Sequence, residues 1–252
     1  MATVTDPGQD ARDVVRARIE QSGWPVSRAM IEWIVALVMF TVSLPVLVIL
    51  GALVKLTSRG PALYTQTRLG RGGRRYRIYK LRTMRHNCER NSGPCWSTPG
   101  DPRITTIGRL LRRTHLDELP QLWNVLKGDM SLVGPRPERP ELAEPLRRKI
   151  PFYDERLRVR PGVTGLAQVQ LPPDTDLASV RRKLMCDLYY VRHASLWLDL
   201  QILVCTVCKV FGLSFEGPGR LLRVPTGEPV ERVYHSLADA SSEAILNLQG
   251  VG

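Results

Sequence analysis

The sequence predicts a mainly helical protein of the α+β class that is attached to a membrane near its N-terminus. A nearly uncharged apolar block occupies residues 30–54 and is long enough to cross a bilayer as a helix. A glycine cluster lies between two alternating stretches in residues 61–84, which is typical of a β-hairpin. Helical patterns account for most of the remaining chain up to residue 215.

These patterns divide the chain into four expected parts. The leader mixes acidic and basic residues and has no apolar core, so we expect no signal peptide there. The C-terminal part shows no strong periodicity, so we expect a loose tail. The parts are a polar leader over 1–29, a membrane segment over 30–54, a globular domain over 55–215 and a tail over 216–252.

The membrane segment carries a proline, Pro45, near its middle. As a straight helix the segment would reach about 37 Å, which favours a helix that spans the bilayer. Proline removes a backbone hydrogen bond, so we expect a kink at Pro45, with Ser43 beside it. A sharp kink would instead give a re-entrant helix that enters and leaves one face. Basic residues flank both ends, which fits two cytoplasmic ends without deciding between the alternatives.

The chain is strongly basic, and the excess charge is concentrated next to the membrane segment. It holds 36 Lys and Arg against 24 Asp and Glu, a formal net charge of +12. Residues 55–85 contain ten of these cations and no acidic residue. Such a run beside an apolar helix is typical of a surface that faces anionic membrane lipids. Phosphorylated substrates would also suit it, whereas we expect no nucleic acid partner because no binding motif is recognised.

The expected globular domain begins with the hairpin and continues as helices. Gly70, Gly72 and Gly73 favour a turn over a phosphate-binding loop, because no helix follows them. The segment from Leu196 to Phe211 is apolar along much of its length, which fits either an interfacial amphipathic helix or a core helix. The expected helices cover 103–113, 117–127, 141–160 and two segments within 176–211 that are divided near 193–195.

Two adjacent carboxylates, Asp117 and Glu118, lie at the start of one predicted helix, with Pro120 in its first turn. One interpretation is ordinary capping, because Asp is a favoured N-cap and Glu and Pro suit the first turn. The other is chemical, because paired carboxylates can hold a divalent metal and present a nucleophilic oxygen. In that case the helix end and nearby cations would lower the pKa of both carboxyls and keep them ionised.

Arginines lie on both sides of this pair in the sequence. Arg109, Arg112 and Arg113 precede it, and Arg136 follows it between two prolines. Arginine binds phosphate through two parallel hydrogen bonds and can stabilise a phosphoryl group in transfer. We interpret Arg113 as a solvated surface residue, whereas the stiff backbone around Arg136 favours a positioned role.

Four segments together resemble the bacterial sugar transferase family, which comprises the monotopic polyprenyl-phosphate sugar-1-phosphate transferases. The segments occur in the family's order and cover roughly residues 30–215, which makes the resemblance specific. It implies a re-entrant membrane helix broken at Pro45. Only about 30 residues precede this helix, so the chain is similar to the minimal phosphoglycosyl transferases. The four segments are KLRTM at 80–84, the block Asp101–Pro137, RPGVTGLAQV at 160–169 and DLYYVRHASLWLDLQILVCT at 187–206.

The resemblance also implies roles for individual residues. Asp117 would be the nucleophile, and Asp117 and Glu118 would hold Mg²⁺. Arg112 and Arg136 would bind phosphate. Further candidates for substrate contact are Lys80, Arg82 and Gln168, and the break in the membrane helix would involve Ser43 and Pro45.

The implied reaction transfers a hexose-1-phosphate from a UDP-sugar to polyprenyl (undecaprenyl) phosphate and releases UMP. It would pass through a covalent phosphosugar-aspartyl intermediate at the cytoplasmic face of the inner membrane, as the first membrane step of glycoconjugate or exopolysaccharide synthesis. The identity of the sugar is left open, and a homodimer is compatible with the sequence. A rival hypothesis is a basic, non-enzymatic membrane scaffold, which leaves the two carboxylates unexplained. A second rival hypothesis is a nucleic-acid binder, and the net charge is the only feature of the sequence that supports it.

Overall fold

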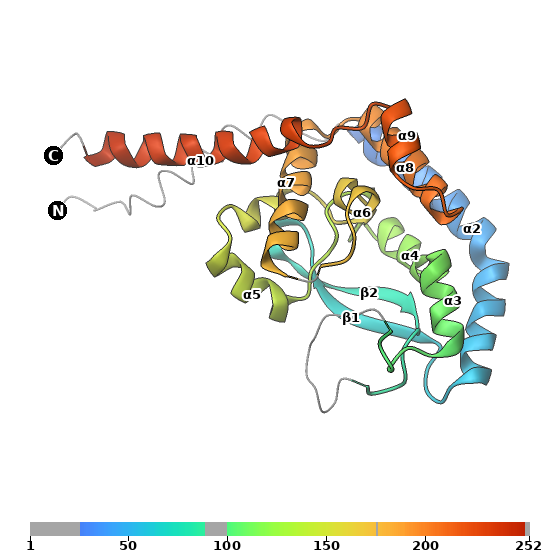
Figure 1. The fold of residues 1–252 in the computed structure, drawn as a ribbon. Helices are drawn as coiled ribbons and strands as arrows, with labels where there is room; N and C mark the ends of the chain where they lie inside the picture. Colours follow the sequence, from blue (N-terminus) through green and yellow to red (C-terminus); the bar gives the residue numbers. More distant parts are fainter. Residues whose placement is uncertain (1–25, 89–99, 175, 250–252) are drawn as a thin grey trace.

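The computed structural model describes residues 26–88, 100–174 and 176–249. The expected polar leader therefore lies almost entirely outside the described residues. Within them the protein is mainly helical and contains two small two-stranded sheets (Figure 1). This arrangement confirms the predicted mainly helical class.

The elements follow one another along the chain as helices, short 3₁₀ turns and strands. The helices are α2 (Val26–Thr57), α3 (Thr106–Thr114), α4 (Gln121–Leu126), α5 (Pro140–Lys149), α6 (Leu166–Gln170), α7 (Leu177–His193), α8 (Leu196–Val210), α9 (Glu216–Leu221) and α10 (Glu228–Gln249). The turns are η1 (Arg71–Gly73), η2 (Leu116–Glu118) and η3 (Tyr153–Arg158), and the strands are β1 (Leu63–Leu69), β2 (Arg75–Leu81), β3 (Ser131–Val133) and β4 (Gly162–Thr164).

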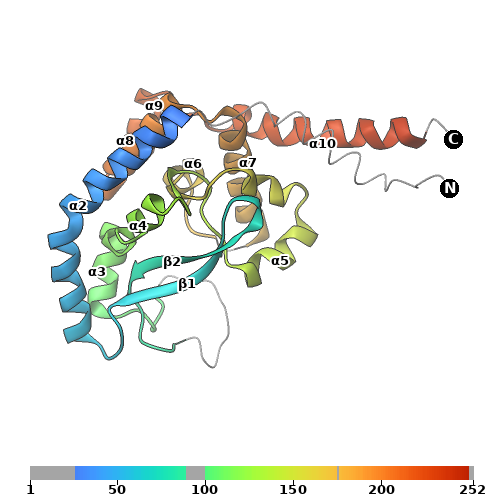
Figure 2. The ribbon, with the colours of Figure 1, turned by 180° about the vertical axis from the view of Figure 1, so that it is seen from behind.

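The apolar block forms α2, which continues through Pro45 and changes direction near its middle (Figures 1 and 2). The Ser43 hydroxyl donates to the Phe40 carbonyl at 2.9 Å, close to the bend. Most large apolar side chains of α2 are exposed, and Ser27–Thr57 is long and apolar enough to cross a membrane. Exposed apolar side chains in this number suit a lipid environment.

Both ends of α2 are held against the same globular body. Near its N-terminal end, Arg28 Nη2 lies 2.5 Å from Asp199 Oδ2 on α8 and 3.0 Å from the Tyr190 hydroxyl on α7. Just beyond its C-terminal end, the Arg59 carbonyl accepts a hydrogen bond from Arg82 Nη1 at 2.5 Å. Because Arg28 and Arg82 are both buried, these contacts are parts of the folded interior.

Strands β1 and β2 form the antiparallel hairpin that the glycine cluster predicts, with Leu69 opposite Arg75. Gly72 and Gly73 adopt φ angles of 64° and 77°, a left-handed conformation that glycine reaches without strain. The chain leaves the turn as β2 rather than as a helix. The prediction of a turn is therefore confirmed.

Three of the predicted helices differ from the structure in their boundaries. The helix expected over 103–113 begins three residues later, as α3. The helix expected over 117–127 begins later, because the carboxylate pair lies in η2 and the regular helix α4 starts at Gln121. The helix expected over 141–160 is divided into α5 and η3. Pro151 has no backbone N–H to donate, and Phe152 adopts a left-handed φ of 60°, so the helix cannot continue.

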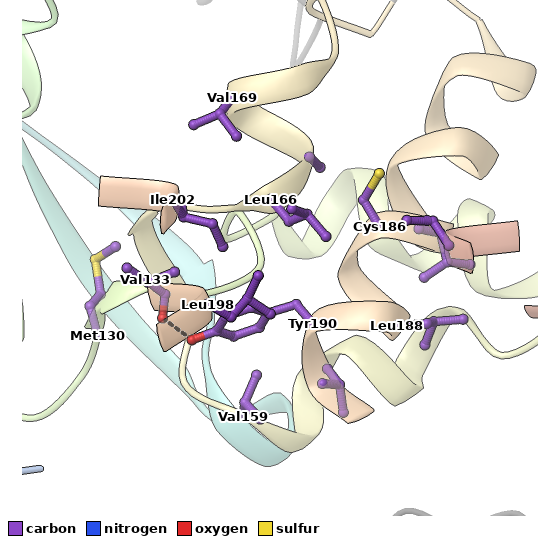
Figure 3. Close-up of a cluster of buried hydrophobic side chains, with 14 of the residues drawn as sticks. Met130, Val133, Val159, Leu166, Val169, Cys186, Leu188, Tyr190, Leu198 and Ile202 are labelled. Atoms are coloured by element: carbon purple, nitrogen blue, oxygen red, sulfur yellow. Dashed lines mark hydrogen bonds between the residues drawn. The ribbon is translucent and has the colours of Figure 1, made fainter. Parts of the chain in front are cut away.

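A small parallel sheet, which no sequence pattern predicted, joins two distant parts of the chain. Ser131 on β3 pairs with Gly162 on β4, and Val133 pairs with Thr164. The main core surrounds this sheet and includes side chains of α4, α6, α7 and α8 (Figure 3). The Tyr190 hydroxyl lies 3.0 Å from the Val133 carbonyl, which ties α7 to β3.

Helix α8 has two different sides. Leu198, Ile202 and Cys205 are buried in the core, as a core helix requires. The opposite side exposes a set of large apolar side chains, as an interfacial helix would. These are Leu196, Trp197, Leu200, Val204, Val207 and Phe211, the last just beyond the helix.

We expected a loose tail over residues 216–252, but the described part of it, residues 216–249, is largely helical. They contain α9 and α10, and α10 packs on α7 before it extends away from the domain (Figure 1). The buried side chains in the first half of α10 recur at spacings of three and four residues, which is the period of one helix face. They are Val230, Val233, Tyr234 and Leu237.

Candidate active site

The two carboxylates lie in a tight turn between α3 and α4. Helix α3 ends at His115, whose left-handed conformation (φ 56°, ψ 15°) turns the chain into η2. Asp117 is buried, with 7% of its surface exposed, and the side chain of Glu118 is 13% exposed. Neither residue is the N-cap of α4, because that position is occupied by Pro120. The capping interpretation therefore does not account for them.

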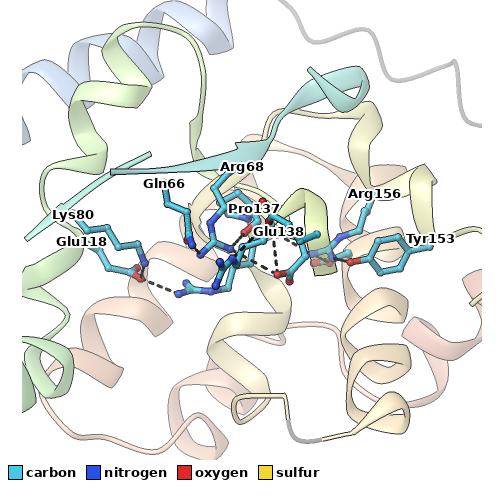
Figure 4. A network of polar contacts seen from close by, with 12 residues as sticks. Gln66, Arg68, Lys80, Glu118, Pro137, Glu138, Tyr153 and Arg156 are labelled. Carbon is cyan, nitrogen blue, oxygen red and sulfur yellow. Dashed lines mark hydrogen bonds and ion pairs between the residues drawn. The ribbon is translucent and has the colours of Figure 1, made fainter. Parts of the chain in front are cut away.

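Glu118 is the anion of a compact ionic cluster. Lys80 Nζ on β2 lies 2.6 Å from Glu118 Oε1, and Arg136 Nη2 lies 3.0 Å from the same oxygen. The Lys80 and Glu118 side chains point toward each other beneath the hairpin (Figure 4). Three residues that are far apart in the sequence are thus brought together, and all three were predicted as site residues.

The pKa of Asp117 is raised, which corrects our expectation that nearby cations lower it. Burial is the larger cause, and the adjacent Glu118 charge adds to it. Lys80, Arg112 and Arg136 act in the opposite direction but do not outweigh burial. An ionised Asp117 is therefore held in a site that disfavours its negative charge.

Glu118 behaves in the opposite way, as predicted. Burial alone would raise its pKa, but Arg136 and Lys80 outweigh burial and lower the pKa well below the usual range of a glutamate. Glu118 in turn raises the pKa of Arg136. Burial lowers the pKa of Lys80, although Glu118 opposes that shift. The pair of adjacent carboxylates thus contains one strongly stabilised anion and one destabilised anion.

Arg112 also reaches the neighbourhood of Asp117. It is close enough to lower the pKa of that carboxyl, and its Nε donates to the Thr83 hydroxyl at 2.9 Å. Thr83 was not singled out in the sequence, although it lies within the KLRTM segment. Arg113 is exposed, as predicted, and Arg109 contacts only its own helix turn through Thr106 at 3.4 Å among the described contacts.

Arg82 and Gln168 do not join this cluster in the structure. The Arg82 guanidinium donates to the carbonyls of Ser58 and Arg59 at the end of α2. The Gln168 side-chain amide donates to the Val163 carbonyl at 3.0 Å, within its own segment. Arg82 therefore connects the segment after β2 to the end of α2.

The two carboxylates are the only candidates for a magnesium site within this turn. No group of three or more His, Cys, Asp or Glu side chains gathers anywhere among the described residues. Mg²⁺ is commonly bound by one or two carboxylates together with water and substrate phosphates, so a two-carboxylate site fits it. The described residues give Asp117 no hydrogen bond or ion pair, which leaves its oxygens available. A divalent cation would also relieve the unfavourable charge of Asp117 beside Glu118.

The chain matches the family model described as bacterial sugar transferase over residues 24–213. A UDP-glucose:undecaprenyl-phosphate glucose-1-phosphate transferase of Caulobacter vibrioides is 44% identical over 196 residues, covering 73% of this chain and 72% of the relative. A putative undecaprenyl-phosphate N-acetylgalactosaminyl 1-phosphate transferase of Bacillus subtilis is 45% identical over 149 residues, covering 57% of this chain and 82% of the relative.

Other relatives are longer proteins. A UDP-N-acetylgalactosamine-undecaprenyl-phosphate N-acetylgalactosaminephosphotransferase of Aeromonas hydrophila is 45% identical over 163 residues. The match covers 65% of this chain but only 38% of that relative. The family match includes α2, the carboxylate pair and all the cations described above, and it ends before α9. The chain therefore belongs to the bacterial sugar transferase family.

Proposed function

We propose that this protein transfers a hexose-1-phosphate from a UDP-sugar to undecaprenyl phosphate and releases UMP. The observation that carries the proposal is the buried Asp117 beside Glu118, whose charge is compensated by Lys80 and Arg136. A carboxylate next to cations suits attack on a phosphoryl group. The relatives are named as transferases of glucose or N-acetylgalactosamine phosphates, and each name includes undecaprenyl phosphate. These names support this class of donor and acceptor.

The proposed reaction has two displacement steps at one phosphorus atom. In the first, an Asp117 carboxylate oxygen attacks the phosphorus that carries the sugar, the bond to the bridging oxygen breaks, and UMP leaves with the electron pair. In the second, a phosphate oxygen of undecaprenyl phosphate attacks the same phosphorus and releases the Asp117 carboxylate. Arg136 and Arg112, which lie near the two carboxylates, would offset the phosphate charge in both steps. The destabilised charge of Asp117 makes it the better nucleophile of the pair.

A magnesium ion held by Asp117 and Glu118 would neutralise part of the charge of the pyrophosphate group. Glu118 is suited to this task because its pKa is lowered and it stays ionised. Lys80 holds the Glu118 side chain in place through the 2.6 Å contact. The chain's own residues thus orient the carboxylates, whatever ion they bind.

We further propose that the protein acts at the cytoplasmic face of the inner membrane and that α2 is re-entrant. Three features support this. The exposed apolar sides of α2 and α8 suit lipid, and the basic run beside α2 suits anionic headgroups. The contacts of Arg28 and Arg82 hold both ends of α2 to one globular body. A helix held in this way has both ends on the same side of the membrane.

The topology is tested by labelling single cysteines in intact cells. In a cysteine-free background, Ser27→Cys and Thr57→Cys mark positions near the two ends of α2, and both are exposed. A reagent that does not cross the membrane is expected to label neither until the cells are opened. Labelling of one position in intact cells would show that α2 spans the bilayer.

The reaction is tested by measuring UMP release in detergent with undecaprenyl phosphate and Mg²⁺. The donors are UDP-glucose, UDP-N-acetylgalactosamine and other UDP-sugars. Wild type is expected to release UMP with at least one donor, and Asp117→Asn is expected to release none. Asp129→Asn is the matched control, because Asp129 pairs with Lys127 at the surface. Folded wild type that releases no UMP with any donor would favour the scaffold hypothesis.

A further inference from the structure

The segment that carries Arg136 is held by four consecutive backbone carbonyls. Proline has no backbone N–H, so Pro135 and Pro137 offer only their carbonyls for hydrogen bonding. Each carbonyl from Pro135 to Glu138 accepts one hydrogen bond from a different residue. The donors are Gly162 N to Pro135 at 2.9 Å, Arg156 Nη2 to Arg136 at 2.9 Å, Arg68 Nη1 to Pro137 at 3.0 Å and Leu69 N to Glu138 at 3.0 Å.

Two of these four donors are backbone amides of the adjacent strands, and the other two are arginine side chains. Arg156 is buried in η3, and its other contacts fix its own position. Its Nη1 donates to the Tyr153 hydroxyl at 3.1 Å, and its Nη2 lies 2.7 Å from Asp187 Oδ2 on α7. The planar guanidinium thus connects the Arg136 backbone to two neighbouring elements (Figure 4).

Arg68 holds the next residue in the same manner from β1. Its Nη2 donates to Gln66 Oε1 at 2.7 Å, while its Nη1 binds the Pro137 carbonyl. Glu138 Oε1 lies 3.7 Å from Arg68, so the charge of this largely buried arginine is partly balanced within the segment. Figure 4 shows Gln66, Arg68, Pro137 and Glu138 gathered in one network with Arg156 and Tyr153.

The Arg136 side chain itself is the most exposed part of its ionic cluster with Lys80 and Glu118. It is 47% exposed and makes its described ion pair with Glu118 at 3.0 Å. A long exposed side chain can adopt many rotamers, so its position depends on how firmly its backbone is fixed. Neutral donors could satisfy two carbonyls without placing two more cations near Arg136. Two rigid guanidinium groups are therefore better explained by a need to fix the position of the Arg136 backbone than by a need for hydrogen-bond donors alone.

We infer that Arg156, together with Arg68, is a positioning residue that sets the location of the Arg136 guanidinium beside the carboxylate pair. The inference rests on the proposed function, in which Arg136 contacts the transferred phosphate. Arg156 contacts no reacting atom and acts only through the backbone of Arg136 and its neighbours. Its contribution to the reaction should therefore disappear when Arg136 can no longer make its contact.

The test is a double-mutant cycle on UMP release, with the UDP-sugar that wild type turns over. Arg156→Lys keeps the charge but loses the planar fork, and it is expected to lower kcat about tenfold with little change in KM. Arg136→Lys serves as the second background because it retains a cation and hence measurable turnover. In the Arg136→Lys background, the additional Arg156→Lys substitution is expected to change kcat less than twofold. Equal losses in both backgrounds would overturn the inference, because a general structural defect does not depend on Arg136.

Two controls separate positioning from folding. Arg158→Lys alters an arginine of the same turn whose ion pair is with Glu155 at 2.5 Å, and it is expected to leave kcat unchanged. If Arg156→Lys does not fold, as thermal unfolding would reveal, Arg68→Lys takes its place in the same cycle with the same expected coupling. If wild type releases no UMP, the proposed function fails, and the cycle is then measured on the affinity for UDP. If the losses of UDP affinity caused by Arg156→Lys and Arg136→Lys simply add, the inference about Arg156 fails independently of the proposed function.

Discussion

Lys80 on β2 and Glu118 in the turn between α3 and α4 form an ion pair, with Nζ and Oε1 2.6 Å apart. Each side chain comes from a segment that would be unremarkable alone, one from a hairpin strand and one from a turn. Their pairing keeps Glu118 ionised beside Asp117, whose own charge is disfavoured by burial and by Glu118. The difference between the two carboxyls is therefore built from long-range contacts, and it leads to predictions about pH.

Replacing Lys80 by Met should lower kcat/KM for UMP release about 100-fold at pH 7. Burial raises the pKa of Glu118, while Arg136 and Lys80 lower it, so removing Lys80 must raise this pKa. Glu118 then takes up a proton at a higher pH, and the acid limb of the pH–rate profile should move to higher pH. Lys127→Met, which removes a lysine paired with Asp129 at the surface, should leave the profile unchanged. A Lys80→Met profile identical in shape to that of wild type would contradict the proposed role.

Arg112 should act on Asp117 through the same physics. Burial and Glu118 raise the Asp117 pKa, and Arg112 is one of three cations that lower it. Arg112→Gln should therefore raise this pKa further, so that UMP release is lost at a higher pH as the solution is acidified. The measurement is the pH dependence of the burst of UMP in the absence of acceptor. Arg113→Gln changes the neighbouring exposed arginine of the same helix and should not move the acid limb.

The sequence was informative wherever a local pattern determines the structure. The glycine cluster predicts the hairpin turn because positive φ angles at Gly72 and Gly73 are needed there. The apolar period predicts α7 and α8, since their core faces are read directly from residue spacing. The carboxylate pair was also found, but its opposite pKa shifts were not. These depend on burial and on Lys80 and Arg136, whose proximity no local pattern contains.

Arg82 lies two positions after Lys80, just beyond the end of β2. Beside the family resemblance it was a candidate for substrate contact, with a structural role as the alternative, and the substrate role stays a prediction. In the structure its guanidinium reaches the end of α2 because the loop after that helix folds back against β2. Which carbonyl a long side chain reaches depends on the placement of another element, and a linear sequence does not specify that placement. The β3–β4 pairing was missed for the same reason.

This placement predicts that Arg82 contributes to stability rather than to chemistry. Arg82→Met should leave the carbonyls of Ser58 and Arg59 without the buried Arg82 donor and should destabilise the fold by roughly 2–4 kcal/mol. Thermal unfolding in detergent should show the loss, while UMP release per folded molecule should stay within about twofold of wild type. Arg85→Met removes an exposed cation from the same basic run and should change neither quantity. A stable Arg82→Met protein without activity would restore the substrate role that the resemblance implies.

The other end of α2 allows a complementary experiment on the Arg28–Asp199 pair. The Arg28 and Asp199 side chains are only 5% and 16% exposed, so breaking the pair leaves an uncompensated charge in a buried site. Arg28→Gln should therefore destabilise the protein by about 3 kcal/mol. Adding Asp199→Asn should recover part of this loss, because the double variant buries no unpaired charge.

The same variants bear on membrane topology. In the re-entrant arrangement, both ends of α2 lie on the cytoplasmic side, where Arg28 contacts Asp199. Breaking this ion pair should then increase proteolysis near residue 28 only when the protease is added to the cytoplasmic side. Inside-out vesicles expose that side, and intact cells treated with protease expose the other. Cleavage near residue 28 in intact cells would show that this end of α2 lies outside, which is incompatible with the contact to α8. Because Arg28 and Asp199 lie 171 positions apart, this pair tests the arrangement of the whole fold.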